Sequence, residues 1–357
     1  MTPDRTLVLV NYFAAGLLGS AIASARHASR TRLRVVVIDN SGDAAESAQL
    51  RSLPIDEIID APENPGYGAG ANMGARDAEG VIIVANPDVE FFPGSIDRLV
   101  DEVTRDGVVA AGPKFVWDRE GEWLLPPPDL PTMGSALDRL AAGWSRWWAE
   151  RWLARRQRER ARFWLRQKPA DERVLSGAVL CLRAEAFHAV GGFDPGYRLY
   201  FEEIDLLERL RRRGGRIRYV PTAVCRHLYN QSAGRSGSEA GAHYARSERR
   251  YYERHFGAWV GKLLLDWRGP LRLAESEHTG SFDAKVTPGE GEWIVEASPL
   301  ADFSSAAGRF TGSEEVRVPP EICDTLQSSE LYVRVVERSS GMPIRSLGLR
   351  RDGTPLE

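Results

Sequence analysis

The strongest constraint on the fold is an alternation, over the first 115 residues, between short apolar stretches and longer helix-compatible ones. The apolar stretches are rich in β-branched residues, which is typical of strands buried on both faces. Strands alternating with helices indicate a parallel sheet covered by helices, in which ligands bind at the carboxyl ends of the strands. The pattern predicts helices at 14–30 and Ile96–Arg105, and strands at Thr6–Val10, Leu33–Ile38, Ile55–Ile59, Val81–Val84 and Val108–Ala111.

Length and composition limit what surrounds this sheet. The chain has 357 residues, of which 43% are apolar and 27% charged, and this fits two folded domains. The net charge of −3 argues against a nucleic-acid-binding protein, and three widely spaced cysteines without a CxxC motif argue against a disulfide scaffold or a zinc finger. No run approaches the roughly 18 apolar residues of a membrane span, and the N-terminus has no signal-peptide pattern. We therefore expect a cytoplasmic protein.

A segment rich in tryptophan and arginine interrupts the α/β pattern. Residues Gly143–Lys168 hold nine basic and two acidic residues, so this stretch has a net charge of +7. Indoles and flanking arginines recur here at every fourth residue, which suits the interface of a bilayer with anionic headgroups. We expect peripheral contact with the inner face of the cell membrane through Trp144–Arg166. The alternative is a helix that packs its tryptophans on the protein's own core.

The sequence after Arg268 changes character again. It is rich in glycine, serine and proline, with short alternating apolar segments at Glu292–Ala297, Glu315–Val318 and Glu330–Val336. This pattern predicts a small β-sandwich. Its role stays open between glycan binding, formation of a homo-oligomer and capping of the first domain. Four aromatic residues fit a sandwich core better than a sugar-binding groove: Trp293, Phe303, Phe310 and Tyr332.

Polar motifs follow the predicted strands, and a second set lies far downstream. The first set consists of Asn11, Asp39-Asn40-Ser41, the glycine-rich loop 64–74 and the sequence ANPDV at 85–89. The second set lies between residues 175 and 227. In their nature and order these motifs resemble those of family 2 glycosyltransferases, in particular the rhamnosyltransferase-like branch. The resemblance covers about residues 5–257 apart from the insertion.

The resemblance implies an α/β protein with the GT-A fold, a Rossmann-like and mostly parallel sheet, over residues 1–268. The tryptophan- and arginine-rich segment is then a helical insertion at about 134–168. Residues 269–357 form a small C-terminal β-sandwich-like domain that lies outside the resemblance.

A nucleotide-sugar donor presents a base, a ribose and a diphosphate. Asp39 can accept a hydrogen bond from a pyrimidine N–H or a ribose hydroxyl, and its alternative is an Asp-Asn turn. The glycines of the loop let backbone N–H groups approach a ligand; no GK[ST] follows, and the loop comes after the third strand, so it is neither a Walker loop nor a dinucleotide fingerprint. The resemblance assigns donor binding to Asn11, Asp39, Asn40, Asn64, Gly66, Gly70, Asn72, Asn86 and Asp88.

A divalent cation is expected beside the donor, because it neutralises the charge that develops on a diphosphate leaving group. Asp88 ends a buried strand, and hard cations take carboxylate ligands. The family carries Asp-x-Asp or the variant present here, Asn86-Pro87-Asp88. A histidine at the place of His227 contributes to the metal site in the family. We therefore expect Mg²⁺ or Mn²⁺ at Asp88 and His227; an Asx-Pro turn is the alternative at Asp88.

Three acids at the start of a predicted helix, Phe201–Arg213, suggest a general base. Transfer with inversion needs a carboxylate to take the proton of the acceptor hydroxyl. The family motif reads Glu-Asp-x-Asp, and Glu203 replaces its first Asp, which moves the carboxylate by roughly 1.5 Å. We expect Glu203 to be the base, with Glu202 as the second candidate. The alternative is that acids simply favour a helix N-terminus.

The resemblance places the acceptor near residues 176–177 and 192–194. The acceptor-side residues it implies are Ser176, Gly177, Asp194 and Asp205. For Asp194, a turn residue before Pro195 is an equal alternative.

Together these expectations describe an inverting, metal-dependent glycosyltransferase of cell-surface polysaccharide biosynthesis. Its donor is a dTDP- or UDP-linked sugar, such as rhamnose or another hexose, and its acceptor a glycan or a lipid-linked glycan. A sugar-phosphate nucleotidyltransferase is disfavoured, because no lysine or arginine follows the first strand before Arg26. A non-catalytic glycan-binding protein is disfavoured by the set Asp88, Glu203 and His227.

Overall fold

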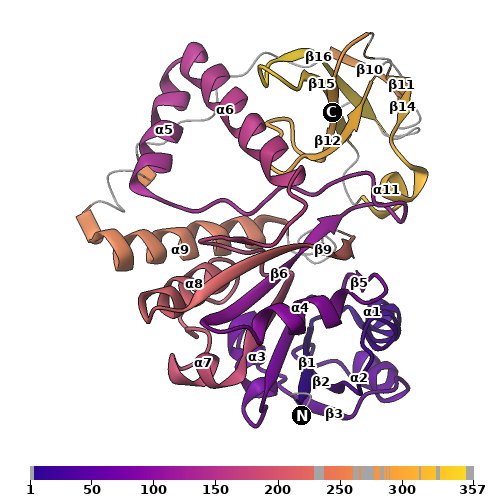
Figure 1. Cartoon of the computed structure of the whole chain (residues 1–357), viewed down its shortest axis with the longest axis vertical. Helices are drawn as coiled ribbons and strands as arrows, with labels where there is room; N and C mark the ends of the chain where they lie inside the picture. The colour runs from indigo at the N-terminus through magenta and orange to yellow at the C-terminus, as the bar shows by residue number, and fades with distance from the viewer. Residues whose placement is uncertain are drawn as a thin grey trace.

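The computed structural model describes residues 4–228, 237–259, 265–266, 277–281, 285–286, 288, 290–312, 315–326 and 330–350. Two parts lie at opposite ends of the long axis, with a helical hairpin beside the smaller one (Figure 1). The larger part contains β1 (Arg5–Asn11), α1 (Ala15–His27), β2 (Arg34–Asp39), α2 (Ala44–Arg51), β3 (Glu57–Asp60), α3 (Tyr67–Ala75), β4 (Val81–Ala85), β5 (Val89–Phe91), α4 (Ser95–Val103) and β6 (Val108–Val116). It continues after the hairpin with β7 (Ala170–Asp171), β8 (Val179–Arg183), α7 (Ala184–Ala189), α8 (Glu202–Arg212), β9 (Arg216–His227) and α9 (Gly237–Phe256).

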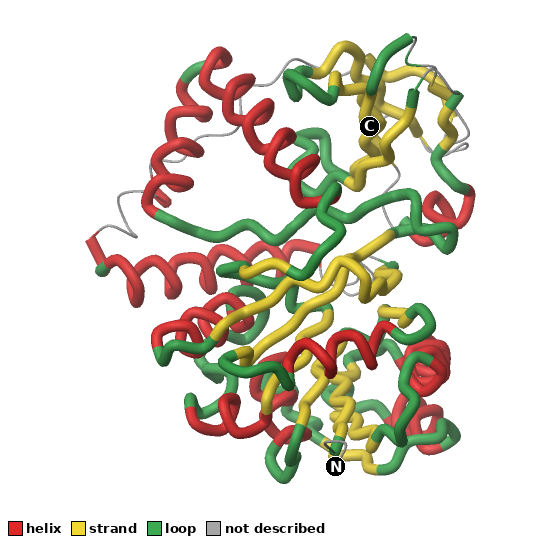
Figure 2. Tube along the Cα trace, in the orientation of Figure 1, coloured by secondary structure: helices red, strands yellow, loops and turns green. Residues whose placement is uncertain are grey.

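These strands form one sheet in the order β3-β2-β1-β4-β8-β6-β9-β5, with β7 paired to β9. The pairs β1/β2, β1/β4, β2/β3 and β6/β9 are parallel, while β8 and β5 run antiparallel to their neighbours. Helices cover both faces of the sheet (Figure 2). The central part of the sheet is therefore a mostly parallel α/β sheet, as predicted.

Alternation along the buried strands builds a core on each face of this sheet. Leu7 and Leu9 of β1 pack with Leu18 of α1, whereas Val8 and Val10 pack with residues of α3 and α8. Both faces of β1 are fully covered, which explains why its sequence is apolar throughout.

The sequence pattern predicts a strand at Arg216–Val220, followed by a turn that leads to His227; β9 instead continues to His227. The sequence contains Pro221, and the pairing of β9 with β6 shifts register between Pro113 and Lys114. An irregularity of this kind lets a strand continue past a proline. As a result His227 is the last residue of β9, not a residue of a turn beyond it.

The insertion is an antiparallel hairpin of α5 (Met133–Trp144) and α6 (Arg146–Trp164), broken at Ser145. The C-terminal part holds a five-stranded, mostly antiparallel sheet in the order β10-β16-β15-β12-β13 and a two-stranded sheet of β11 and β14. The bounds are β10 (Glu277–Ser281), β11 (Lys285–Val286), β12 (Trp293–Ser298), β13 (Ala307–Thr311), β14 (Val316–Arg317), α11 (Pro320–Thr325), β15 (Glu330–Glu337) and β16 (Pro343–Arg350).

The C-terminal sheets share their core with the segment that follows β6. Trp117 and Trp123 are almost completely buried among residues of β12, β14 and β15. Trp164, the last residue of α6, packs on Ile294 in the same part of the chain. The C-terminal strands therefore enclose side chains that come from the first half of the sequence.

Candidate active site

The carboxyl ends of β1 and β2 lie side by side and bring Asn11 and Asp39 together. The two residues are register partners, and Asn11 Nδ2 donates to Asp39 Oδ1 at 3.1 Å. Asn11 is completely buried and also donates to Glu46 at 3.2 Å. Its side chain therefore positions Asp39 and the start of α2.

Asp39 is held as an ionised acceptor. Burial raises the pKa of its carboxyl, but hydrogen bonds from Ser41 and Ser47, both at 2.6 Å, outweigh this effect and lower the pKa overall. The carboxylate is therefore fixed in position and charged at neutral pH.

Asn40 connects this edge to the glycine-rich loop. Its Nδ2 donates to Asn64 Oδ1 at 3.3 Å and to the carbonyl of Gly66 at 3.4 Å. Its buried Oδ1 has no hydrogen-bond partner within the described part of the chain. A buried acceptor without a partner is costly, so this oxygen suits an N–H donor of a ligand.

The glycine-rich segment 64–74, which we expected to be a loop, is mostly helix, because α3 begins at Tyr67, and its glycines face close neighbours. Gly66 precedes α3 with φ of 99°, and a Cβ atom there would lie 2.5 Å from the carbonyl oxygen of Arg198. A Cβ on Gly70 would lie 3.3 Å from Val10 and 3.5 Å from Asn40 Nδ2. Gly66 therefore has to lack a side chain for the chain to pass against Arg198, whereas a Cβ at Gly70 would be tight only against Val10.

Asn72 has a different environment from the one we expected. Its amide donates to the carbonyl of Phe193 and accepts from the N–H of the same residue, both at 2.8 Å. Both ends of the side chain are thus used inside the protein. Asn72 therefore holds the loop around Phe193 against α3.

Asp88 and His227 meet where β5 pairs with β9. Val89 is the register partner of His227, and Asp88 Oδ1 lies 3.3 Å from His227 Nε2. Asp88 is only 4% exposed. The backbone N–H of Asn86, two residues before Asp88, is bonded to the carbonyl of Ala178 at 2.9 Å, which ties this turn to β8.

The pair Asp88 and His227 fits a divalent cation that completes its shell elsewhere. Among residues that the structure describes, no group of three histidine, cysteine or acidic side chains is placed to hold a metal. Mg²⁺ commonly takes one or two protein ligands and draws the rest from water and substrate phosphates. A two-residue site therefore suits a cation that bridges protein and diphosphate better than a structural metal.

The acids at the head of α8 follow a strained backbone. Tyr200 and Phe201 both have left-handed φ values, 69° and 68°. Strain of this kind in non-glycine residues clusters at functional sites. Burial and the charge of Glu203 raise the pKa of Glu202 well above its usual value, while burial raises the pKa of Glu203 to about 7. Burial therefore favours the neutral form of both carboxyls, and the charge of Glu203 adds to this effect at Glu202.

Tyr67, the first residue of α3, lies among these acids and was not predicted as a site residue. Its hydroxyl donates to the carbonyl of Gly177 at 3.4 Å. Burial raises its pKa well above the usual value, and the charges of Glu202, Glu203 and Asp88 raise it further. The charges of the α8 acids and of Asp88 therefore all act on the Tyr67 hydroxyl. In the sequence, only the position of Tyr67 between Gly66 and Gly68 of the glycine-rich segment could have indicated a role in the site.

Ser176 and Gly177 lie in front of Glu203. A Cβ atom on Gly177 would stand 3.2 Å from Cγ of Glu203. The hydroxyl of Ser176 accepts the N–H of Ala178 at 3.3 Å, which fixes the turn before β8. This turn therefore borders the space next to the Glu203 carboxyl, on the side where we expected the acceptor.

Asp194 and Asp205 have structural partners instead of facing that space. Asp194 forms ion pairs with Arg250 and Arg254 of α9, the first at 2.9 Å. Asp205 is completely buried and pairs with Arg209 at 2.7 Å and with His255 at 3.1 Å. Both carboxylates hold α9 against the body of the protein, and the sequence could not indicate this because the partners on α9, Arg250, Arg254 and His255, lie 50 to 60 residues downstream.

Comparison with known proteins agrees with the motifs. The model of glycosyl transferase family 2 matches residues 6–171. An N-acetylglucosaminyl-diphospho-decaprenol L-rhamnosyltransferase of Mycobacterium tuberculosis is 32% identical over 291 residues, which is 76% of this chain and 92% of that protein. The chain belongs to glycosyl transferase family 2. It is therefore a glycosyltransferase of the rhamnosyltransferase-like kind, and the predicted fold class and enzyme class are confirmed.

Other relatives of this glycosyltransferase are more distant. The O-antigen biosynthesis protein RfbC of Myxococcus xanthus is 26% identical over 244 residues, which is 61% of this chain and 16% of that protein. Among solved structures, a mannosyltransferase from Pyrobaculum calidifontis in complex with GDP-Man and Mn²⁺ is 14% identical, with 75% of this chain and 69% of that chain covered and a TM-score of 0.49. Within the described residues, no helix is both long and apolar enough to cross a bilayer.

Proposed function

We propose that this glycosyltransferase moves a hexose, with rhamnose as the first candidate, from a dTDP- or UDP-linked donor to a lipid-linked glycan. The donor sugar and the acceptor are suggested by the mycobacterial relative, whose name describes L-rhamnosyl transfer to a diphospho-decaprenol-linked sugar. The observation that carries the proposal is geometric: Gly177 lies against Glu203, and the carbonyl of the next residue, Ala178, accepts the N–H of Asn86, two residues before Asp88. It brings a metal-binding acid and a candidate base to one place.

In this proposal the donor lies along the carboxyl ends of β1, β2 and β4. Asp39 and Asn40 Oδ1 face the nucleoside, while Asn11, Asn64, Gly66 and Gly70 shape the surface on which it lies. Asp88 and His227 would hold Mg²⁺ or Mn²⁺, with Asn86 beside them. The cation would supply charge neutralisation at the diphosphate.

The reaction is proposed as one displacement with inversion at the anomeric carbon. The proton of the acceptor hydroxyl passes to the carboxylate of Glu203 as the oxygen forms its bond to the anomeric carbon. The bond between that carbon and the diphosphate oxygen breaks, and its electron pair leaves with the nucleoside diphosphate. A base with a pKa of about 7 suits this step, because it is partly ionised at neutral pH and still takes up a proton readily.

In this proposal Glu202 is the neutral member of the acidic pair, in keeping with the raised pKa that burial and the charge of Glu203 give it. Its buried Oε2 has no hydrogen-bond partner in the described part of the chain, so a substrate hydroxyl can pair with it. We propose that the acceptor approaches over Ser176 and Gly177. Contact with the membrane that holds a lipid-linked acceptor, through the α5–α6 hairpin, belongs to the same proposal.

The test compares Glu203→Gln with Glu202→Gln in transfer from dTDP-rhamnose and UDP-sugars to a diphospho-lipid-linked acceptor. Glu203→Gln is expected to lower turnover at least about a thousandfold, while nucleotide diphosphates with Mn²⁺ still raise the melting temperature. Greater loss in Glu202→Gln would move the base to Glu202. Near wild-type turnover in both variants would refute the proposed mechanism.

A further inference from the structure

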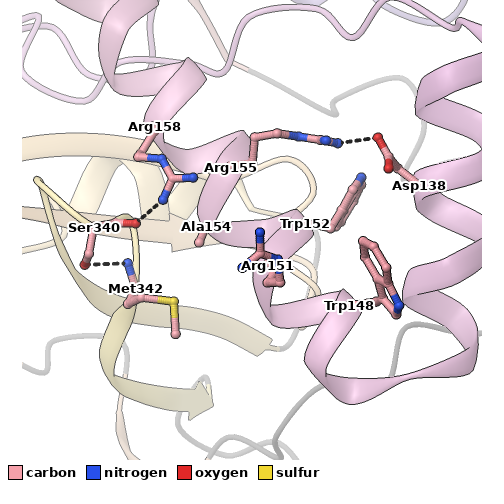
Figure 3. A pocket seen from close by; sticks show the side chains of 9 residues that line it. All are labelled: Asp138, Trp148, Arg151, Trp152, Ala154, Arg155, Arg158, Ser340 and Met342. Atoms are coloured by element: carbon pink, nitrogen blue, oxygen red, sulfur yellow. Dashed lines mark hydrogen bonds and ion pairs between the residues drawn. The ribbon is translucent and has the colours of Figure 1, made fainter.

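The α5–α6 hairpin encloses a pocket that the transferase reaction does not use. It lies between α6, α5 and the turn that leads into β16, and has a volume of about 350 Å³. Figure 3 shows arginines and tryptophans of α6 on one side and Ser340 and Met342 on the other. The side chains that matter below are Trp148, Arg151, Trp152, Arg155, Arg158 and Met342.

The pocket has more positive charge than its neighbours neutralise. Arg155 pairs with Asp138 at 2.6 Å, while Arg158 donates to the carbonyl of Ser340 at 2.6 Å. The guanidinium of Arg151 lies over the ring of Trp147, 4.7 Å from its centroid. Among the described residues, no carboxylate lies within ion-pair distance of Arg151 or Arg158. Two guanidinium groups are thus left to bind an anion.

Large aromatic side chains on the same hairpin are exposed, and one of them, Trp148, lines the pocket. Trp144, Trp147 and Trp148 are 61%, 56% and 45% exposed at the end of the hairpin where its two helices meet. Leaving three indoles in water forgoes their burial energy, so a partner is expected to cover them. Indoles with arginines prefer the interfacial layer of a bilayer, where a flat apolar ring lies next to charged headgroups.

The C-terminal part of the chain holds this surface rigidly. Arg160 is buried and donates to the carbonyls of Phe303 and Ser304 at 3.0 and 2.6 Å. Trp164 donates to the carbonyl of Leu125 at 2.8 Å and is 2% exposed. The face of α6 that carries Arg160 and Trp164 is therefore buried, whereas Trp147 and Trp148 near the start of the helix are exposed.

We propose that the pocket binds the phosphate of an anionic phospholipid headgroup while the exposed indoles enter the interfacial layer of the bilayer. The inference rests on the membrane contact of the proposed function and deepens it by naming the headgroup and the residues that bind it; it requires neither the donor nor Glu203. Charge favours this occupant: residues 143–168 have a net charge of +7 in a chain of net charge −3. A second copy of the chain would bring the same positive segment against itself.

The test is co-sedimentation of the full-length protein with vesicles of phosphatidylcholine alone or mixed with phosphatidylglycerol. Wild type is expected to bind the mixed vesicles and not the neutral ones. Arg151→Glu and the double variant Trp144→Ala/Trp147→Ala are each expected to weaken binding at least about tenfold. The matched controls Arg76→Glu and Trp259→Ala change an exposed residue of the same type outside the hairpin, and are expected to bind as wild type does.

Other occupants give different results. If inorganic phosphate stabilises wild type but not Arg151→Glu, and no vesicle binds, the pocket is a free-phosphate site and docking is refuted. If the tryptophan variants convert an oligomer to a monomer in light scattering and vesicles do not bind, the surface is an interface between copies. Equal loss in the controls would also refute the proposal. The increase in melting temperature that a nucleoside diphosphate causes is measured in parallel for Arg151→Glu. If this increase persists while vesicle binding fails, the docking proposal is wrong and the transferase site is intact.

Discussion

Gly177 lies directly against the side chain of Glu203: a Cβ atom on Gly177 would stand 3.2 Å from Cγ and 3.3 Å from Cδ of the glutamate. Separations of this size are tighter than ordinary van der Waals contact, so an added methyl group would push the carboxyl aside. Glu203 is one methylene longer than the aspartate found in the family motif. The missing side chain at residue 177 gives that longer carboxyl the room it occupies.

Gly177→Ala is therefore expected to displace the base without touching the nucleotide site. Turnover should fall about 10- to 100-fold, because misplacing a reacting group by a fraction of an ångström is costly. The shift in melting temperature caused by a nucleoside diphosphate with Mn²⁺ should not change. Gly241→Ala in α9 is the control, since a Cβ there meets nothing within 4 Å. Unchanged turnover in Gly177→Ala would show that Glu203 needs no such room.

The raised pKa of Glu203 predicts the acid limb of the pH profile. The base must be ionised to accept a proton, and burial raises its pKa to about 7. We expect kcat/KM to fall about tenfold per pH unit below pH 7. A base with the ordinary pKa of a glutamate would instead keep kcat/KM constant down to about pH 4.5. The measurement is kcat/KM against pH at saturating metal. A profile that stays flat down to about pH 5 would exclude Glu203 as the base.

The same shift predicts a pH-dependent gain in stability for Glu203→Gln. Between pH 4.5 and about 7 the folded protein binds more protons than the unfolded chain, so its stability falls as the pH rises. Glutamine does not ionise and avoids this loss. The variant should melt at a higher temperature than wild type at about pH 8, and the difference should shrink at about pH 5. A variant that melts lower at both values would contradict the shift.

The buried strands could be predicted because their sequences are short, β-branched and apolar on both faces. The extension of β9 to His227 could not be predicted, because a proline such as Pro221 normally ends a strand. Here β9 continues to pair with β6 only through the register shift opposite Pro221. The polar residues at strand ends were also identifiable. Asn72 and Asp205 are of residue types that are common in binding sites. Their hydrogen-bond partners in the protein, Phe193 and His255, are distant in the sequence, so the sequence could not reveal these structural roles.

The tryptophans of the insertion show the same limit. Their spacing predicted one helix surface and left open whether it faced a membrane or the core. Trp164 is buried on Ile294, and Trp147 is exposed. The difference depends on where the C-terminal sheet meets α6, and no local pattern in the sequence contains that information.

Asp88→Asn and His227→Gln are expected to remove the metal dependence of nucleotide binding. Both keep a similar shape, so the 3.3 Å contact between the two side chains can persist while the charge and the imidazole are lost. Wild type should show a melting-temperature increase with dTDP or UDP that requires Mn²⁺ and is abolished by EDTA. The variants should show the same small shift with and without Mn²⁺, and turnover at least about a hundredfold lower.

For this pair of variants the control is Asp60→Asn at the end of β3, an exposed acid on the same sheet. It should keep the full Mn²⁺-dependent shift. A Mn²⁺-dependent shift that survives in both Asp88→Asn and His227→Gln would place the metal elsewhere.

Trp164→Ala is expected to be far more harmful to folding than Trp147→Ala. The indole of Trp164 fills the space between α6 and the C-terminal sheet, and it lies so close to Gly308 that a Cβ there would stand 2.4 Å from the ring. Its removal should lower the free energy of unfolding by about 3–5 kcal/mol, whereas loss of an exposed indole should change it by about 0.5 kcal/mol or less. Urea denaturation of the full chain measures both. Equal losses of stability in the two variants would mean that the C-terminal sheet does not hold α6 in place. The inference that this sheet positions the exposed tryptophans would then be wrong.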